Sequence, residues 1–251
     1  MSLNIDHDEE SILKELSKLS KLGPIVSVNT GSNAVGKLLQ ESLNISHSTS
    51  KRNSFYNYTI TATTSKLNST GRTNLFACVP NWQSSPFRSS KEIVENFGRE
   101  NLSRGYSKCL FCSVTSQGPN GFGLVLKIDR DKPSIEEWYV SEKEQYLVAS
   151  WSIPKLMYKL GLLNKTAIIT ALPIEIRDKK AFHYRYVDLL KNPNFNNFID
   201  LIENGSITMD HCISIKTDKN SAREQGPLFK IRSNAREDLY QNIKRIDLMD
   251  L

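Results

Sequence analysis

Two threonines, Thr59 and Thr61, are spaced as the metal-binding residues of a phosphate-cleaving site would be, two positions apart in an expected strand. Residues 57–64 read Asn-Tyr-Thr-Ile-Thr-Ala-Thr-Thr, and in a strand Thr59 and Thr61 emerge on the same face of the sheet. Carboxylates placed in this way can hold Mg²⁺, which stabilises the charge on a phosphate and lowers the pKa of a bound water. A hydroxyl is a poor Mg²⁺ ligand without a carboxylate beside it. The segment therefore has the layout of a metal-dependent site without the side chains that such a site uses.

Basic residues gather between residues 216 and 245 and on both sides of the threonine strand. Such residues can neutralise the phosphates of a nucleic acid, which provides affinity and position. The alternative is that they are ordinary solubilising charges. The candidates for phosphate contact are Lys51, Arg52, Arg72, Lys216, Arg223 and Arg232.

The overall charge balance also favours a polyanionic partner. The 251 residues contain 33 Lys and Arg against 27 Asp and Glu, which gives a net charge of +6. No apolar run approaches the ~20 residues of a membrane span, and the acidic start, with Asp6, Asp8 and Glu9, is unlike a signal peptide. We therefore expect a cytoplasmic protein without a membrane partner.

The cysteines do not suggest a disulfide framework or a zinc site. Cys109 and Cys112 form a lone C-x-x-C within an apolar run of strand composition, and the other two cysteines, Cys78 and Cys212, lie far from them in the sequence. Buried free thiols are the favoured interpretation, and a metal or redox site is the alternative.

Hydrophobic periodicity and turn residues predict a mixture of helices and strands. Helices are expected at residues 6–22, 37–43, 90–100, 151–163, 195–204 and 237–246. Strands are expected at residues 55–62 and 72–79, joined as a hairpin, and at 105–115, 121–129, 135–140, 168–177, 181–187, 207–216 and 228–233. Because this order lacks regular βαβ alternation, we predict an α/β chain of mixed α+β type, with a mixed sheet flanked by helices.

Four segments, taken in order, resemble the MvaI/BcnI family of type II restriction endonucleases, relatives of the mismatch-repair nuclease MutH in the PD-(D/E)XK superfamily. They are residues 34–45, residues 57–61 with 73–76 and Pro80, residues 151–177, and residues 198–210 with 225–230. The resemblance implies a restriction-endonuclease-like, MutH-like central mixed sheet flanked by helices, with two lobes around a DNA cleft. It also implies a monomer that acts on short double-stranded sites with Mg²⁺.

The catalytic positions of the family do not carry over. By the resemblance, Gln40 stands for a helix Glu, Ser54 for the Asp, Thr59 for the strand Glu and Thr61 for the Lys. Loss of the carboxylates should remove most Mg²⁺ binding, so we expect a degenerate site and no cofactor. The alternative is that the catalytic carboxylates have moved, with Glu41 and Glu175 as candidate ligands of Mg²⁺.

The segment that approaches the bases in the family reads Gln225-Gly-Pro-Leu-Phe-Lys230 here. Gln225 can pair with adenine and Lys230 can donate to guanine. These replacements would therefore change the DNA sequence that is recognised more than they would abolish recognition. His211, on an expected strand, either faces the cleft or is a hydrogen-bonded structural residue.

These features predict a sequence-specific double-stranded DNA-binding protein with a degenerate metal-nuclease site, a pseudo-nuclease. The two alternatives are an active Mg²⁺-dependent type II restriction endonuclease with migrated carboxylates, and a non-catalytic subunit that supports another nuclease as a protein partner. We expect one restriction-endonuclease-like domain over residues 1–251, with a catalytic-type lobe at about 1–130 and DNA-recognition elements at about 165–251. The protein is expected to act as a monomer on DNA.

Overall fold

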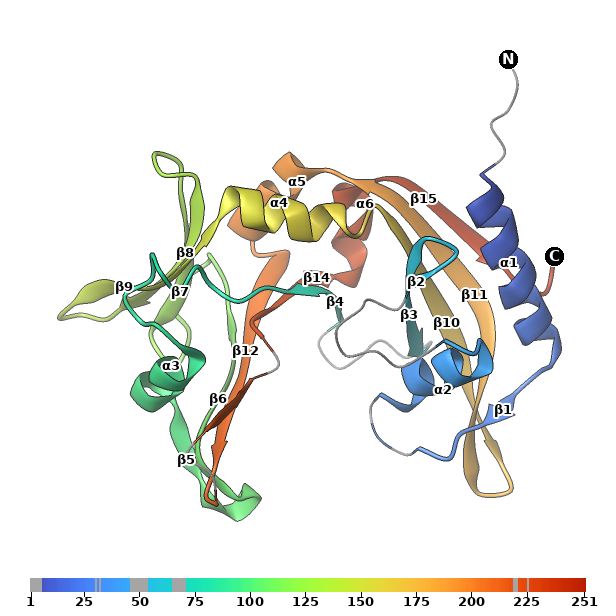
Figure 1. The fold of residues 1–251 in the computed structure, drawn as a ribbon, viewed down its shortest axis with the longest axis horizontal. Helices are drawn as coiled ribbons and strands as arrows, with labels where there is room; N and C mark the ends of the chain where they lie inside the picture. Colours follow the sequence, from blue (N-terminus) through green and yellow to red (C-terminus); the bar gives the residue numbers. More distant parts are fainter. Residues whose placement is uncertain are drawn as a thin grey trace. The chain divides into compact units, whose positions relative to one another are not determined.

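The computed structural model describes residues 6–29, 31, 33–45, 54–64, 71–218, 221–224 and 226–251. The chain divides into two compact units (Figure 1). Unit 1 comprises Met1–Gly71, Leu162–Pro193 and Tyr240–Leu251, and unit 2 comprises Arg72–Gly161 and Asn194–Leu239. The units therefore interleave along the sequence, since each combines early and late segments of the chain. The reason is that early and late strands pair with each other in both units.

Unit 1 is built on a mixed sheet, here called sheet A, as the sequence predicts. Its strands follow the order β1-β11-β10-β3-β2, and β15 also pairs with β11. The β3–β10 pair is parallel, while the other pairs are antiparallel. The strands are β1 (Ile25–Val26), β2 (Ser54–Phe55), β3 (Tyr58–Thr64), β10 (Lys165–Ile176), β11 (Lys179–Pro193) and β15 (Tyr240–Asp247).

Helices α1 (His7–Lys21) and α2 (Ala34–Ser42) cover one face of sheet A. The helical spacing of Ile12, Leu16 and Leu19 places all three in the core of unit 1. On β3, Tyr58 and Ile60 are buried in the same core. Because side chains alternate along a strand, Thr59 and Thr61 lie on the opposite face of the sheet.

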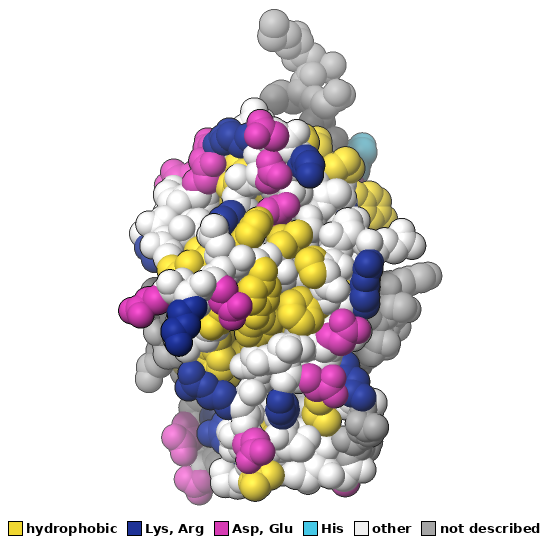
Figure 2. Space-filling model, turned by 90° about the vertical axis from the view of Figure 1, so that its left-hand side faces the viewer, with side chains coloured by type: hydrophobic (Ala, Val, Ile, Leu, Met, Phe, Trp, Pro, Cys, Tyr) yellow, Lys and Arg dark blue, Asp and Glu magenta, His cyan; other side chains and the backbone are white. Residues whose placement is uncertain are grey.

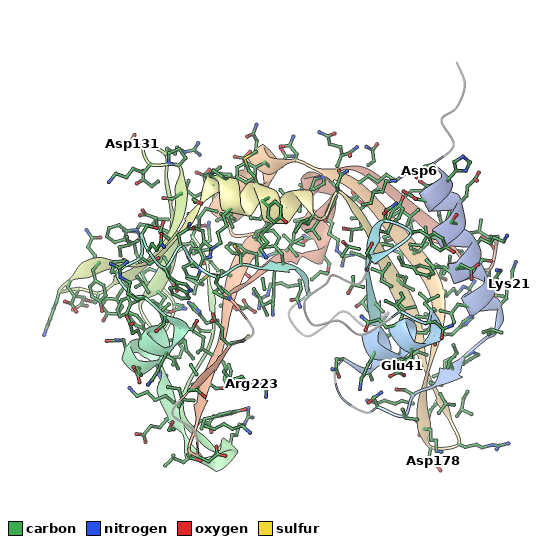
Figure 3. All side chains as sticks on the ribbon, in the orientation of Figure 1. Asp6, Lys21, Glu41, Asp131, Asp178 and Arg223 are labelled. Atoms are coloured by element: carbon green, nitrogen blue, oxygen red, sulfur yellow. The ribbon has the colours of Figure 1, made fainter. Side chains whose placement is uncertain are left out.

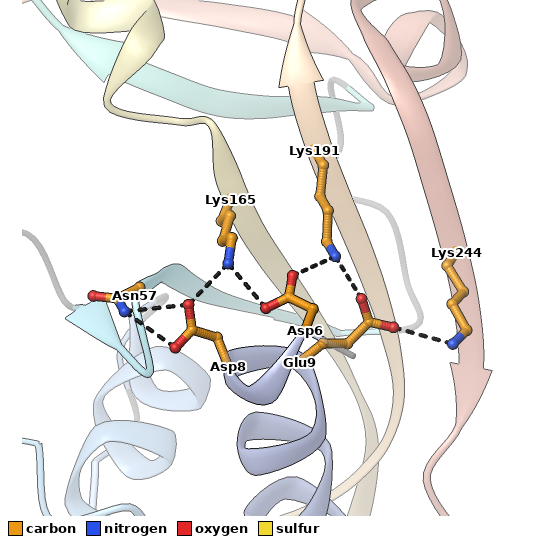
Figure 4. Close-up of polar contacts among 7 residues, drawn as sticks. All are labelled: Asp6, Asp8, Glu9, Asn57, Lys165, Lys191 and Lys244. Carbon is orange, nitrogen blue, oxygen red and sulfur yellow. Dashed lines mark hydrogen bonds and ion pairs between the residues drawn. The ribbon is translucent and has the colours of Figure 1, made fainter. Parts of the chain in front are cut away.

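An ion-pair cluster, shown in Figure 4, ties the start of α1 to sheet A. Lys165 Nζ donates to Asp6 at 3.0 Å and to Asp8 at 2.8 Å, while Lys191 Nζ donates to Asp6 at 2.8 Å. Hydrogen bonds mainly from Lys191 and Lys165 lower the pKa of Asp6 to about 2, despite partial burial, which raises it. The cluster consists of Asp6, Asp8, Glu9, Asn57, Lys165, Lys191 and Lys244.

This cluster should make the docking of α1 sensitive to acid. A carboxyl whose pKa is lower in the folded state contributes stability above its unfolded pKa, and this stability is lost as the pH falls through the folded value. We expect the protection of the amides of residues 7–21 from hydrogen exchange, measured relative to their intrinsic rates at each pH, to fall between about pH 4 and pH 2. Asp6→Asn should cost about 1 kcal/mol at pH 7, since solvent screens the pairs. In the control, Glu15→Gln, which affects a pair within α1, the acid profile should stay unchanged. An Asp6→Asn profile identical to wild type would contradict the assignment.

Unit 2 contains two sheets within its described residues. Sheet B follows the order β4-β14-β12-β6-β5, with β13 also paired to β12, and sheet C follows β7-β8-β9. Sheet B comprises β4 (Arg72–Ala77), β5 (Arg99–Asn101), β6 (Tyr106–Val114), β12 (Ile207–Lys216), β13 (Ala222–Glu224) and β14 (Leu228–Arg232). Sheet C comprises β7 (Leu124–Asp129), β8 (Ser134–Val140) and β9 (Gln145–Ser152).

Four α-helices and two short 3-10 helices complete the described part of unit 2. They are α3 (Ser90–Phe97), η1 (Leu102–Arg104), α4 (Ile153–Gly161), α5 (Phe195–Glu203), η2 (Ser233–Ala235) and α6 (Arg236–Leu239). The rings of Phe76, Phe198 and Phe229 pack against one another in the core. None of the helices in the described part of the chain has the length and apolarity that a membrane crossing requires.

Three sequence predictions about elements are wrong. The strands expected at 55–62 and 72–79 do not form a hairpin, because β3 pairs with β2 and β10 in sheet A while β4 pairs with β14 in sheet B. The helix expected at 237–246 is mostly strand β15, since the backbone of this segment pairs with strand β11. The helix expected from residue 151 begins only at Ile153, after strand β9.

Candidate nucleic-acid interface

The hydroxyl positions of the degenerate site come together on sheet A. Ser54 lies directly opposite Thr59 in the tight β2–β3 hairpin, and Thr61 follows Thr59 on the same face. Directly opposite residues of an antiparallel pair have Cβ atoms about 5 Å apart. Thr61 is exposed, while Thr59 is half-buried and donates from Oγ1 to the carbonyl of Leu162 at 3.4 Å. Three of the four predicted positions therefore form one surface, which we call the hydroxyl face.

The two predicted site residues of the helix, Gln40 and Glu41, lie on α2, which covers the opposite face of sheet A from the hydroxyl face. Gln40 and Glu41 belong to α2, whose Leu38 and Leu39 pack in the core with Tyr58. Gln40 is half-buried at the edge of this packing, and Glu41 is exposed on α2, as Figure 3 shows. Among the predicted positions, the structure thus separates the helix pair from the strand hydroxyls.

Glu175, the other candidate for a migrated ligand, is remote from the hydroxyl face. It lies seven residues beyond Ile168, the residue that pairs with Thr61, which corresponds to about 23 Å along β10. It stands near the turn of the β10–β11 hairpin, whose end carries the labelled Asp178 in Figure 3. Glu175 therefore cannot supply a ligand to a metal held at Thr59 and Thr61.

Strand register identifies a carboxylate that the sequence interpretation missed. Asp188 of β11 pairs with Ile168, which in turn pairs with Thr61, so Asp188 lies on the hydroxyl side of the sheet about 10 Å away. Its carboxylate faces Arg245 at 3.7 Å. The sequence pattern could have revealed this position, because Asp188 lies between the core residues Val187 and Leu189 and must therefore point to the opposite face of the strand.

The residues at the hydroxyl face do not fit Mg²⁺. The ion takes nearly ideal octahedral oxygen coordination, usually with one or two carboxylates, and three neutral hydroxyls supply no charge to it. In the described residues, no group of three or more His, Cys, Asp or Glu side chains is placed to hold a metal ion.

The predicted DNA-contacting cations come together on sheet B. Strand register places Lys230 opposite Thr208, Arg232 opposite Arg72, and Arg223 opposite Ser214. Thr208, Ser214 and Lys216 alternate on one side of β12, so all of these side chains share one surface. We call this surface the cationic face, and its basic members are Arg72, Lys216, Arg223, Lys230 and Arg232. Figure 3 labels Arg223 on this part of the fold.

The cations of this face divide into a half-buried group and an exposed group. Arg72 Nη1 and Lys230 Nζ each lie 2.7 Å from the carboxylate of Asp210. Burial raises the pKa of Asp210, but hydrogen bonds from Lys230 and Arg72 outweigh it and lower the pKa. Arg72 is therefore mainly a structural cation, whereas Lys216, Arg223 and Arg232 are exposed and available to a polyanion.

His211 does not belong to the cationic face, which corrects its proposed contact with DNA. It lies on the other side of β12, where both its side chain and that of Glu137 are fully buried. Its Nε2 is 2.7 Å from the Glu137 carboxylate. Burial lowers the pKa of His211, but the charge and hydrogen bond of Glu137 outweigh it and raise the pKa. His211 is therefore a hydrogen-bonded structural residue, and its pair with Glu137 joins β12 of sheet B to β8 of sheet C.

The C-x-x-C cysteines point to different sides of β6. Cys109 pairs with Ser214 of the cationic face, while Cys112 pairs with His211 of the interior. Side chains on opposite faces of a strand cannot share one metal ion. Burial raises the pKa of the Cys112 thiol to about 12, and all four cysteines are free thiols.

Three further candidates, Lys51, Arg52 and Gln225, lie outside the described residues. A different surface of the molecule, on the side of β7–β9 and α3, has interspersed basic and acidic side chains around an apolar centre (Figure 2). Mixed charge of this kind does not favour a polyanion, in contrast to the cationic face.

Comparisons with known proteins agree with this architecture. The family model described as the MvaI/BcnI restriction endonuclease family matches residues 13–240. A solved structure of restriction endonuclease MvaI with its cognate DNA substrate is similar, with a TM-score of 0.77, 17% identity, and coverage of 95% of this chain and 97% of that chain. Restriction endonuclease MvaI in the absence of DNA gives a TM-score of 0.56 at 18% identity, covering 98% of this chain and 99% of that chain. No curated protein matches the chain.

Proposed function

Since this chain belongs to the MvaI/BcnI restriction endonuclease family, we propose that it binds double-stranded DNA at specific sequences and has lost the metal-dependent cleavage. The observation that carries the DNA-binding role is the shared surface of Lys216, Arg223 and Arg232, whose exposed charges match a phosphate backbone. The protein acts in the cytoplasm as a monomer, and its binding requires no cofactor.

The loss of cleavage is supported by the hydroxyl face. Cleavage of a phosphodiester by a bound metal ion needs carboxylates to hold the ion and an activated water to attack. Ser54, Thr59 and Thr61 offer hydroxyls instead. Removal of carboxylates also reduces repulsion of the phosphates, because like charges a few ångströms apart repel by about 1 kcal/mol even in water.

The proposal is tested by incubating the protein with a randomised duplex library in Mg²⁺, Mn²⁺ or Ca²⁺ and scoring retained sequences and nicks from the same tubes. Sequence-enriched retention without nicks is the expected result. Metal-dependent nicks at a fixed sequence would refute it and favour an active nuclease. Neither retention nor nicks would also refute it, in favour of a subunit that acts through a protein partner.

One observation favours the nuclease alternative, namely Asp188 on the hydroxyl side of sheet A. If nicks are found, Asp188→Asn separates a migrated site from contamination, since the variant should abolish nicking only if Asp188 holds the metal. The pairing of Asp188 with Arg245 makes this alternative the weaker one.

Two carboxylates introduced on the hydroxyl face should make DNA binding depend on metal. In Ser54→Asp/Thr59→Glu the new groups stand opposite each other across the hairpin, close enough to share one ion. Affinity in EDTA should fall about tenfold through repulsion of the phosphates and recover in Ca²⁺. The control, Ser54→Asn/Thr59→Gln, has similar shape without charge and should bind equally with and without Ca²⁺. Metal-independent binding by the acidic variant would show that DNA does not approach this face.

A further inference from the structure

The cationic face of sheet B contains an exposed aromatic residue, Phe111 of β6. Its exposed fraction is 48%, although most large apolar side chains of the β6 and β12 strands are in the core. Strand register places Phe111 directly opposite Cys212, on the same side of the sheet as Asp210 and Ser214. Phe111 is one of several exposed large apolar residues, but it is set apart by its position among the charged and hydrogen-bonding groups of the cationic face.

Two neighbours make the surroundings of Phe111 apolar and fix its ring. The ring of Tyr106 meets that of Phe111 edge-on, with centroids 5.9 Å apart. Burial raises the pKa of the Cys212 thiol, so this half-buried side chain stays neutral at physiological pH and behaves as a small apolar group. We call Phe111, Tyr106 and Cys212 the apolar spot.

Polar groups enclose the apolar spot along the strands. One strand period from Cys212 in one direction lies Asp210, with the amine of Lys230 at 2.7 Å, and one period in the other lies Ser214, paired with Arg223. A strand period of about 6.6 Å is roughly two base-pair steps of a duplex. A duplex whose phosphates are held by the exposed cations Lys216, Arg223 and Arg232 can therefore place the edges of its bases at the spot.

On these grounds, and resting on the proposed DNA-binding function, we propose that the apolar spot is a specificity element that contacts the C5-methyl group of thymine in the major groove. Among the four bases thymine alone presents a methyl group there, and proteins read it with apolar side chains. β6 and β12 are adjacent inner strands of sheet B, and they present Phe111 and Cys212 side by side on its cationic face, where the major-groove edge of a base can contact them.

The test first selects a bound duplex sequence from a randomised library and then compares it with the same duplex carrying uracil in place of thymine, one position at a time. Uracil lacks only the methyl group. Wild type should lose affinity about three- to fivefold at one thymine or more, the factor that burial of one methyl-sized group provides. Phe111→Ala should bind both duplexes equally while keeping the salt dependence of wild type.

Tyr146→Ala is the matched control, because Tyr146 is a partly exposed aromatic residue of unit 2 that packs on another ring, Tyr139, in sheet C. This variant should retain the thymine preference. Phe111→Leu, which keeps an apolar side chain, should retain part of it and guards against a folding defect in the alanine variant.

Specific DNA binding without any effect of uracil would overturn the inference and leave the proposed function standing. Retention of the thymine preference in a folded Phe111→Ala protein would also overturn it. A response to 5-methylcytosine without one to uracil would assign the spot to a modified base instead and so refute the thymine contact. Absence of DNA binding by wild type would refute the function and the inference together.

Discussion

Replacement of His211 by alanine is expected to lower the free energy of unfolding of unit 2 by about 3–5 kcal/mol. The side chains of His211 and Glu137 are fully buried and 2.7 Å apart, so the variant leaves a carboxylate in the interior without its partner. Removal of one member of a buried pair costs far more than the pair itself contributes. All three tryptophans, Trp82, Trp138 and Trp151, lie in unit 2, so denaturation followed by tryptophan fluorescence reports on this unit.

The double variant Glu137→Leu/His211→Leu is the control for this prediction. It removes both charges and should recover most of the lost stability, since apolar residues of similar volume often replace a buried pair at little cost. The pair also predicts a pH effect. A histidine whose pKa is raised by folding contributes stability fully below its unfolded value near 6.5, and loses it as the pH rises through the folded value. A single variant with a cost below about 1 kcal/mol would contradict the assignment.

The triple variant Lys216→Ala/Arg223→Ala/Arg232→Ala should weaken DNA binding by about three orders of magnitude at low salt. These three cations are exposed on the cationic face, where they can each neutralise a phosphate. The slope of log affinity against log salt should fall in magnitude by about 0.9 for each phosphate that the variant no longer neutralises. Affinity measured by fluorescence anisotropy over a salt series gives both quantities.

The same change in net charge on α1, Lys14→Ala/Lys18→Ala/Lys21→Ala, separates a local interaction with DNA from a general charge effect. All three lysines are exposed on that helix. The α1 variant should keep nearly the wild-type slope, and equal reductions in affinity for the two triple variants would show that the cationic face has no special role.

Much of the local structure could be predicted from the sequence because it depends on periodicity within one segment. The expected strand 207–216 coincides with β12, and the expected helix 195–204 differs from α5 by one residue. The alternation in β12 also contained the signal that His211 points inward, since it shares a side with Met209 and Ile213. Residue type suggested a DNA contact for His211, while its position in the strand excluded one.

Which strands and side chains pair with each other could not be predicted from the sequence in the same way. Glu137 and His211 are 74 positions apart, and Arg72 and Asp210 are 138 apart. Nothing local to Tyr240–Asp247 indicates that β11 is its partner, so the helical spacing of that segment was misleading. Phe111 is informative only once the register of β6 against β12 shows which side it occupies.

The parallel pairing of β3 with β10 also affects how this protein is made on the ribosome. More than a hundred positions separate Thr61 from its partner Ile168, and β15, which joins the same sheet, begins only at Tyr240. A growing chain that has emerged only as far as residue 161 holds most of unit 2 but neither β12 nor β10, so neither unit can close. Such long-range pairing slows folding and leaves strand edges exposed meanwhile. Synthesis of this protein should therefore depend strongly on chaperones, and truncation before Tyr240 should yield insoluble chains.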